Sequence, residues 1–199
     1  MPQGNQVAMA DGRILFTIGH SNHSATHFQS LLKRHGIEVL VDIRSWPHSR
    51  FVEWADQARL PDIVHGASSK YLFLGDSLGG RPEGSEFYDR NGHVLYWRVA
   101  RAKQFRNGMD RLQRGVETCR VAVMCSEENP ETCHRRLLVS KVMLERGFGV
   151  EHIRGNGVCE RETGGICSSE DSLFEDEEAL WISSRSVSRN RAPSTSLNA

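Results

Sequence analysis

The stretch MCSEENPETCHRR gathers the side chains best suited to chemistry. An apolar run ends at Cys125, and Cys133 follows eight positions later with His134 and Arg135 directly behind it. A thiol at a strand end that faces the start of a helix has a lowered pKa and is a stronger nucleophile. We predict nucleophilic or acid–base roles for Cys125, Glu127 and His134, and substrate contacts for Cys133 and Arg135. The simpler alternative is that Cys125 is an ordinary buried core thiol.

The same stretch raises the question of a metal site. Zinc takes four protein ligands in a structural site, or three and a water molecule in a catalytic one. Enough ligand atoms are available from Cys125, Cys133, His134, His20 and Asp42. However, seven residues between two cysteines is not a standard zinc spacing, and no second cysteine pair accompanies them. The sequence therefore predicts no metal site, and it identifies no cofactor.

Arginines near the ends of the expected strands suggest an anionic ligand. Asp42 and Arg44 lie two residues apart, so both point to the same side of a strand. They form a structural ion pair, or Arg44 holds an anion while Asp42 orients Arg44 or acts as a base. Arg50 and Arg81 follow in loops at the same edge. Several arginines around one cleft predict a ligand with a phosphate or carboxylate group.

Turns that contain glycine lie at the same expected edge. Gly19, His20 and Ser21 follow the first strand, and the backbone amides of this turn could hold an anion. His20 is a candidate general acid or base, or a loop histidine bonded to backbone. Gly80 lies in LGDSLGGRP, which matches neither of the common glycine-rich nucleotide motifs. We expect substrate contacts from Gly19, Ser21 and Gly80, but no conventional ATP or NAD site.

Alternating strands and helices must position these residues. Short apolar runs predict five strands, at residues 14–18, 37–44, 70–75, 119–125 and 148–153. Helices are expected after Ser24, within 51–66, over 97–115, and from Pro130 to Arg146. This order predicts a three-layer α/β fold, with a mostly parallel sheet of about five strands and helices on both faces. Such sheets bind ligands outside the carboxyl ends of their strands, where the candidate residues fall.

The chain divides into three parts by composition. We interpret 1–12 as a leader, 13–158 as the α/β domain, and 159–199 as an acidic and then Ser- and Arg-rich tail. The end of this tail is expected to be largely disordered. Apolar side chains in the tail could dock a short helix on the domain: Leu173, Phe174, Leu180 and Trp181. Within the domain, the glycine-rich stretch 76–93 is expected to be a loop.

Charge and composition limit the class of protein. In 199 residues, 25 lysines and arginines balance 25 aspartates and glutamates, so net charge gives no attraction to nucleic acids or membranes. The first residues lack the apolar segment of a secretory signal, and no run approaches the roughly 20 apolar residues that span a bilayer. Five cysteines do not resemble a secreted disulfide framework. We expect a cytoplasmic protein with no membrane contact; the sequence does not indicate its oligomeric state.

Several motifs resemble one known family. TIGHS (17–21), LVDIRSWPHSR (40–50), LGDSLGGRP (74–82) and MCSEENPETCHRRLL (124–138) look like motifs of domain of unknown function 488 (DUF488), and GVEHI fits its final strand. The resemblance covers about residues 14–157. It supports one domain over this range, but the family name carries no activity.

Three functions are compatible with these features. The first is an enzyme that acts on an anionic substrate, such as a nucleotide or nucleic acid, at the carboxyl edge of the sheet. The second is a non-catalytic nucleic-acid-binding module that uses a basic helix. Its cations are Arg98, Arg101, Lys103, Arg106, Arg111 and Arg114. The third is a thiol redox sensor built from Cys125 and Cys133.

Overall fold

A six-stranded sheet forms the centre of the molecule. The computed structural model describes residues 13–49, 51–163 and 181–186. The strands lie in the order β3-β2-β4-β1-β5-β6. Their bounds are β1 Ile14–Gly19, β2 Val39–Asp42, β3 Lys70–Phe73, β4 Val121–Cys125, β5 Gly149–Ile153 and β6 Cys159–Arg161.

The first five strands run parallel, and β6 pairs antiparallel with β5. The register places Gly19 of β1 beside Cys125, and Asp42 of β2 beside Met124, in β4. The carboxyl ends of these three neighbouring strands therefore meet at one edge. The predicted α/β fold with a mostly parallel sheet is confirmed, and β6 is a strand that the sequence did not predict.

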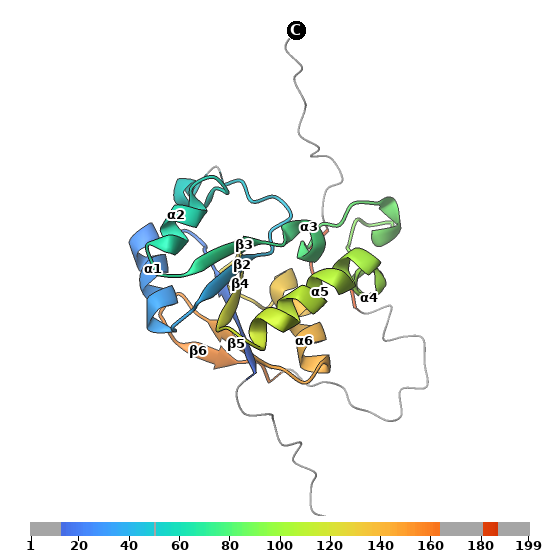
Figure 1. Ribbon diagram of the computed structural model, residues 1–199. Helices are drawn as coiled ribbons and strands as arrows, with labels where there is room; N and C mark the ends of the chain where they lie inside the picture. Colours follow the sequence, from blue (N-terminus) through green and yellow to red (C-terminus); the bar gives the residue numbers. More distant parts are fainter. Residues whose placement is uncertain (1–12, 50, 164–180, 187–199) are drawn as a thin grey trace, which may run out of the picture.

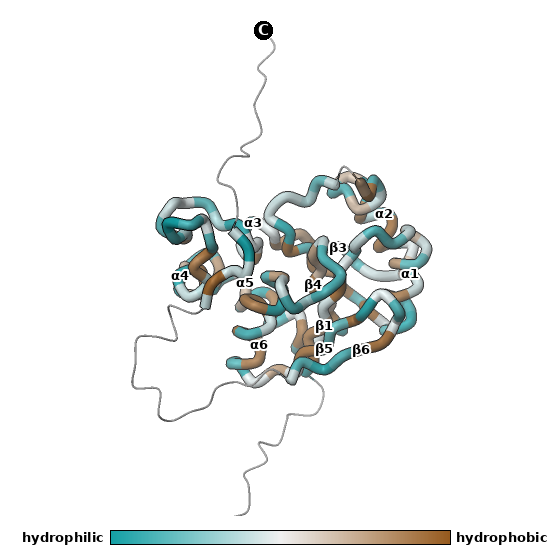
Figure 2. Tube along the Cα trace, turned by 180° about the vertical axis from the view of Figure 1, so that it is seen from behind, coloured by the Kyte–Doolittle hydropathy of each residue, from teal (hydrophilic) through white to brown (hydrophobic). Residues whose placement is uncertain are grey.

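Helices cover both faces of the sheet, as Figure 1 shows. The helices on one face are α1 (Ala25–Arg34) and α2 (Leu60–His65), and those on the other are α5 (Lys103–Val116) and α6 (Lys141–Glu145). Figure 2 shows hydrophobic segments gathered where the sheet and the helices meet. Successive side chains of β1 point to opposite faces of the sheet, so this strand contributes to the core on both faces. Leu15 packs on the α5 side, and Phe16 and Ile18 pack on the α1 side.

Helix α1 begins where the sequence predicts. The side chain of Ser24 accepts a hydrogen bond from the backbone amide of His27, which caps the helix and contributes about 1 kcal/mol. Phe28, Leu31 and Leu32 lie on its buried side. In 51–66, where one or two short helices are expected, the structure has η1 (Glu53–Ala55) and α2, and Pro61 lies in the first turn of α2.

The prediction of a single helix over 97–115 is wrong. Two helices, α4 (Tyr96–Arg101) and α5, meet at Ala102, whose backbone is extended. Val99 and Phe105 are both buried. On one straight helix, six positions of about 100° each would place their side chains about 120° apart, so both could not point directly at the core. The break turns both apolar sides toward the core. All six cations of the basic set are exposed on α4 and α5: Arg98, Arg101, Lys103, Arg106, Arg111 and Arg114.

The helix expected to start at Pro130 begins later. Asn129 accepts a hydrogen bond from the amide of Glu131, which makes a local turn and does not cap a helix. The helical segment starts after Cys133, first as the wide π-helical η3 (Arg135–Ser140) and then as α6. Cys133 therefore precedes the helix and does not lie in its first turn.

The glycine-rich stretch after β3 is not entirely loop. It contains the short helix α3 (Gly75–Leu78) and the single turn η2 (Ser85–Phe87). Leu78 is fully buried and belongs to the core cluster that includes α5, which explains why this segment is ordered as a helix.

A short C-terminal segment, residues 181–186, docks on the domain in an extended form. Ile182 forms an isolated β-bridge with Leu95, and the amide of Ser183 donates to the carbonyl of Val94 at 2.9 Å. The indole of Trp181 donates to the carbonyl of Leu137. The other apolar residues expected to dock, Leu173, Phe174 and Leu180, lie outside the described residues, as do 187–199.

Within the part of the chain that the structure describes, no helix combines the length and apolar character needed to cross a bilayer.

Replacing Gly19 with alanine should destabilise the fold, because an added Cβ would fall on the carbonyl oxygen of Glu127. Forcing packed backbone apart costs about 1–3 kcal/mol of unfolding free energy. Urea unfolding followed by circular dichroism measures the change.

Gly115→Ala in α5 is the matched control. An added Cβ there meets only the side chain of Val121, at 3.7 Å, so this change should be neutral or stabilise by up to about 1 kcal/mol. If Gly19→Ala is as stable as the wild type, β1 does not approach the loop after β4 this closely.

Candidate active site

The candidate site lies at the end of β4, between segments that leave the sheet in opposite directions. The chain after β1 and after β2 leads to helices on one face, whereas the chain after β4 leads to η3 and α6 on the other. Strand β4 lies between β2 and β1. Neighbouring strands whose helices cover opposite faces leave a crevice at their carboxyl ends, where α/β folds bind ligands.

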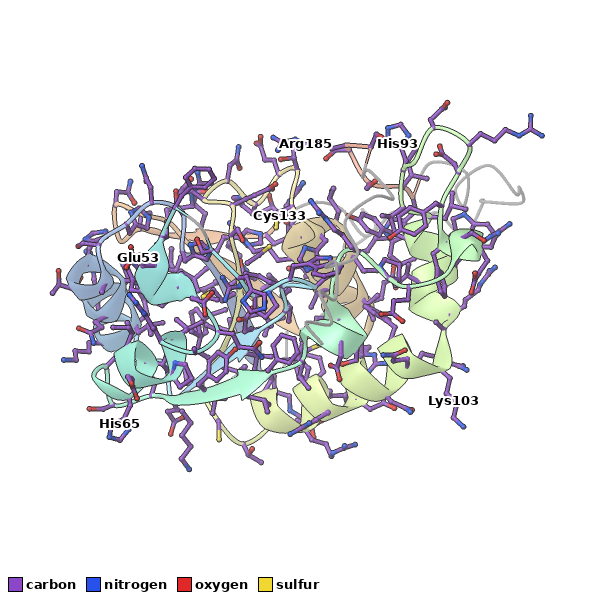
Figure 3. All side chains as sticks on the ribbon, turned by 90° about the horizontal axis from the view of Figure 1, so that it is seen from above. Glu53, His65, His93, Lys103, Cys133 and Arg185 are labelled. Atoms are coloured by element: carbon purple, nitrogen blue, oxygen red, sulfur yellow. The ribbon has the colours of Figure 1, made fainter. Side chains whose placement is uncertain are left out.

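A pocket of about 410 Å³ opens in this crevice. Its walls come from the loops after β2 and β4, the glycine-rich segment after α3, and the C-terminal segment 181–186. The predicted site residues in its walls are Arg44, Gly80, Arg81, Cys125, Glu127, Cys133 and His134. Figure 3 shows Cys133 inside the molecule, whereas Lys103 extends outward from α5.

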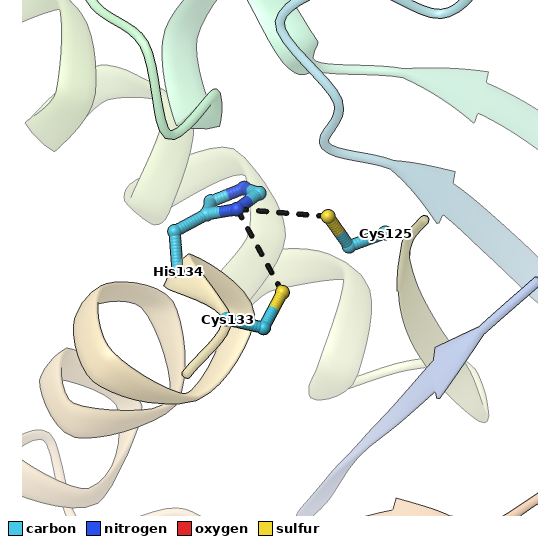
Figure 4. A group of neighbouring side chains, drawn as sticks. All are labelled: Cys125, Cys133 and His134. Carbon is cyan, nitrogen blue, oxygen red and sulfur yellow. Dashed lines mark hydrogen bonds between the residues drawn. The ribbon is translucent and has the colours of Figure 1, made fainter. Parts of the chain in front are cut away.

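Cys125, Cys133 and His134 converge at the buried side of the pocket (Figure 4). Nδ1 of His134 lies 3.6 Å from Sγ of Cys125 and 3.9 Å from Sγ of Cys133. Nε2 lies 3.0 Å from the carbonyl oxygen of Ile43. A carbonyl oxygen only accepts hydrogen bonds, so Nε2 carries a proton and donates it. Nδ1 is therefore the ring atom that can exchange a proton with a sulfur.

The two thiols differ in acidity. A hydrogen bond from Cys133, the charge and hydrogen bond of His134, and the charge of Arg135 lower the pKa of Cys125 well below its ordinary value, although burial opposes this. The same hydrogen bond, together with burial, raises the pKa of Cys133 well above its ordinary value. Both shifts favour deprotonation of Cys125, with Cys133 as the neutral hydrogen-bond donor, and a lowered thiol pKa is how proteins activate a nucleophilic cysteine.

His134 completes this charge distribution. Burial by itself lowers the pKa of His134, but the charge of Cys125 and its hydrogen bond outweigh burial and raise that pKa. When protonated, the ring donates from Nε2 to the carbonyl of Ile43 and from Nδ1 to the sulfur of Cys125. An imidazolium held in this way can return its proton to a leaving group.

Arg135 fixes the loop that carries Glu127. Its side chain is 1% exposed, and its guanidinium donates to the backbone carbonyls of Glu127 and Glu128. Arg135 does not line the pocket. This position serves the loop, and it does not present the guanidinium to a substrate.

The turn after β1 fixes the same loop from the other side. The amide of His20 donates to the carbonyl of Cys125 at 3.0 Å, and that of Ser21 donates to Ser126 at 2.9 Å. These amides are therefore occupied, and the expectation that they hold an anion is wrong. Gly19 contributes by its small size, which lets β1 lie against the loop.

Asp42 and Arg44 form a buried ion pair. Arg44 donates from Nε and Nη2 to the two carboxylate oxygens of Asp42, at 2.9 and 2.7 Å, and the hydroxyl of Tyr71 donates to the same carboxylate. Both oxygens of Asp42 are thus engaged, and Asp42 is fully buried. Arg44 lines the pocket, and its described hydrogen bonds use three of its five N–H groups. Two remain for a ligand.

His20 supports Arg44 and does not line the pocket. Nη1 of Arg44 donates to Nε2 of His20 at 3.2 Å, and Nδ1 of His20 donates to the carbonyl of Ser21 at 2.8 Å. Burial and the charge of Arg44 lower the pKa of His20, which keeps the ring neutral. Both ring nitrogens are therefore engaged with protein groups.

The mouth of the pocket combines cations with an aromatic ring. Arg81 is exposed, and its amide donates to the side chain of Ser45 at 2.9 Å. A Cβ on Gly80 would lie 2.6 Å from the ring of His134, so glycine lets this loop pack on the imidazole. Trp46 is 47% exposed beside the same opening.

Glu127 places a carboxylate in the pocket wall. Its Oε1 lies 3.4 Å from Nη1 of Arg185, which comes from the C-terminal segment 181–186. Its Oε2 is buried and has no hydrogen-bond partner among the described residues. An unpartnered buried carboxylate oxygen is costly unless a ligand or a proton satisfies it.

The structure brings seven of the thirteen predicted site residues together in one pocket. The residues outside its walls are Gly19, His20, Ser21, Asp42 and Arg135, which hold neighbouring elements in place. Arg50 lies outside the described residues.

Sequence reasoning missed several wall residues. Trp46 lies in SWPHSR, directly after a predicted strand, and this position is the signal in the sequence that could have identified it. Tyr96 and the segment 183–186 also line the pocket. No local pattern in the Ser-rich tail distinguishes residues 183–186, because a β-bridge between Ile182 and Leu95 brings them to the pocket.

Comparison with known proteins identifies a family. Residues 24–142 match the family model described as domain of unknown function DUF488. No curated protein and no solved structure matches the chain. The matched range contains Cys125, Cys133 and His134 and covers more than half of the sequence. The resemblance seen in the motifs is thereby confirmed, and the chain belongs to the DUF488 family.

Proposed function

We propose that this protein is an enzyme that acts on an anionic, phosphate-bearing substrate with Cys125 as its nucleophile. The observation that carries the proposal is the contact between Sγ of Cys125 and Nδ1 of His134, 3.6 Å apart at the inner side of an arginine-lined pocket. A nucleophile and its base within reach, with the base oriented by a third group, is the pattern of covalent catalysis. The carbonyl of Ile43 is that third group.

The step that follows from this geometry is a displacement. The thiolate of Cys125 attacks an electrophilic atom of the substrate, and the bond from that atom to its leaving group breaks. Nδ1 of His134 gives its proton to the leaving group and becomes neutral. Water, deprotonated by the same nitrogen, then releases the covalent intermediate and restores the thiolate.

Cations at the pocket favour an anionic substrate. Arg44 has two N–H groups beyond those used by its described partners, and it is held rigidly by Asp42. Arg81 and Arg185 also line the pocket. Arginine binds phosphate oxygens through paired N–H groups. Trp46 offers a flat surface on which a nucleotide base can stack.

The distance between the sulfur atoms favours a thiol redox sensor as the second candidate function. Sγ of Cys125 and Sγ of Cys133 lie within 4.8 Å of each other. In that case a peroxide would take two electrons and two protons from the thiols and leave a disulfide and water. Labelling with and without peroxide separates the two functions, because only the redox sensor loses both thiols together.

Small anions should slow the alkylation of Cys125. Iodoacetamide is neutral, so a phosphate or sulfate ion bound by the arginines would block its approach to the thiolate. Mass spectrometry of digested protein measures the rate at Cys125. Arg81→Gln should raise the anion concentration needed for half-protection by roughly 10- to 100-fold, the effect of losing one charged hydrogen bond.

Arg106→Gln is the matched control, because Arg106 is exposed on α5 and does not line the pocket. Its protection curve should coincide with that of the wild type. Alkylation that proceeds at one rate with and without either anion would rule out the anion site.

Turnover of a substrate should depend on Cys125 and His134. On a panel of phosphate esters, nucleotides and short oligonucleotides, Cys125→Ser should remove activity, and His134→Ala should lower kcat by about 10²- to 10⁴-fold. Cys119→Ser changes a thiol outside the pocket and should be neutral. Turnover that survives in Cys125→Ser would refute the nucleophilic role.

A further inference from the structure

The three atoms at the inner side of the pocket also have the geometry of a metal site. Nδ1 of His134 lies 3.6 and 3.9 Å from the two sulfurs, and all three atoms lie within 4.8 Å of one another. A tetrahedral zinc ion, with bonds of about 2.3 Å to sulfur and about 2.0 Å to nitrogen, separates sulfur from nitrogen by roughly 3.6 Å. The two nitrogen–sulfur separations are therefore already close to those of a zinc site.

The donor set suits a soft divalent cation. Two sulfurs and one imidazole nitrogen are preferred zinc ligands, and they leave a fourth position free. Cys125, Cys133 and His134 all line the pocket, so this fourth position can take water or a ligand from the pocket. A site with three protein ligands and one open position is typical of reactive zinc.

The surroundings of His134 also suit a metal ligand. A zinc-bound histidine usually donates its other ring N–H to a carbonyl or carboxylate, which fixes the ring and its tautomer. The carbonyl of Ile43 already accepts from Nε2 at 3.0 Å, so Nδ1 is the nitrogen that faces the sulfurs. Both thiols are themselves buried, with exposures of 8% for Cys125 and 2% for Cys133.

We propose that Cys125, Cys133 and His134 bind Zn²⁺ reversibly, and that the bound ion blocks the thiol chemistry of Cys125. The first part is independent of the proposed function, and the second part rests on it. Binding displaces the proton on Nδ1 of His134 and the thiol proton of Cys133, and both protons pass to the solvent. The sulfur of Cys125 then donates its electron pair to zinc and is no longer free to attack a substrate.

Cobalt provides the probe for the site, because Co²⁺ bound by thiolates in a tetrahedral site absorbs in the near ultraviolet and visible ranges. Titration of metal-free, reduced protein with Co²⁺ should give these bands at one ion per chain, and Zn²⁺ should abolish them. Cys133→Ser and His134→Ala should each weaken binding by more than about 100-fold, which is the upper end for losing only an outer-shell contact.

Controls separate a lost ligand from a lost fold. Cys159→Ser removes a half-buried thiol outside the pocket and should retain the bands. Circular dichroism should show that all variants are folded. Absence of thiolate–cobalt bands in the wild type, or their persistence in folded Cys133→Ser, would overturn the metal site.

Alkylation tests the second part separately. Zn²⁺ at one ion per chain should slow the reaction of iodoacetamide with Cys125 by at least about 10-fold in the wild type, because the metal-bound sulfur is less nucleophilic. If the thiolate–cobalt bands appear but Zn²⁺ does not slow alkylation, the blocking role is overturned and the metal site is not. Slow, pH-insensitive alkylation of Cys125 in metal-free protein would instead count against the proposed enzyme, independently of the result of the cobalt titration.

Discussion

One hydrogen bond, from Nε2 of His134 to the carbonyl oxygen of Ile43, sets the chemistry of the pocket. Because a carbonyl cannot donate, this contact keeps a proton on Nε2 and leaves Nδ1 to face the two sulfurs. Gly80 packs against the same ring and limits its rotation. A ring held in this way serves two uses. With a proton on Nδ1 it can stabilise a Cys125 thiolate, and without that proton it can act as a metal ligand.

The rest of the site holds this arrangement in place. Strand β4 delivers Cys125 between β2 and β1, and the loop after it folds back so that Cys133 returns to Cys125. The buried guanidinium of Arg135 binds the carbonyls of that loop, while amides from the turn after β1 bind its opposite side. A buried charge without partners is strongly destabilising, and the two terminal nitrogens of Arg135 find theirs in the carbonyls of this loop. These contacts hold the loop between Cys125 and Cys133 from both sides.

The sequence predicted the sheet and the shared edge, because strand ends and their polar residues are local signals. Leu15, Phe16 and Ile18, for example, mark a buried strand without reference to the rest of the chain. The break at Ala102 was visible in principle, since Val99 and Phe105 are out of phase on one helix. Other features depend on tertiary contacts. The pairing of Cys125 with His134, the burial of Arg135 and the docking of Arg185 at the pocket all join residues that local patterns cannot relate.

In the metal-free protein, we expect Cys125 to be a thiolate that His134 stabilises. An ultraviolet titration of thiolate absorbance across pH, in the presence of a chelator, measures this directly. We expect an absorbance step that Cys125→Ser lacks, with a midpoint well below the ordinary cysteine value of about 8.5, and a higher midpoint in His134→Ala. A wild-type midpoint at or above about 8.5, or one that His134→Ala leaves unchanged, would contradict it.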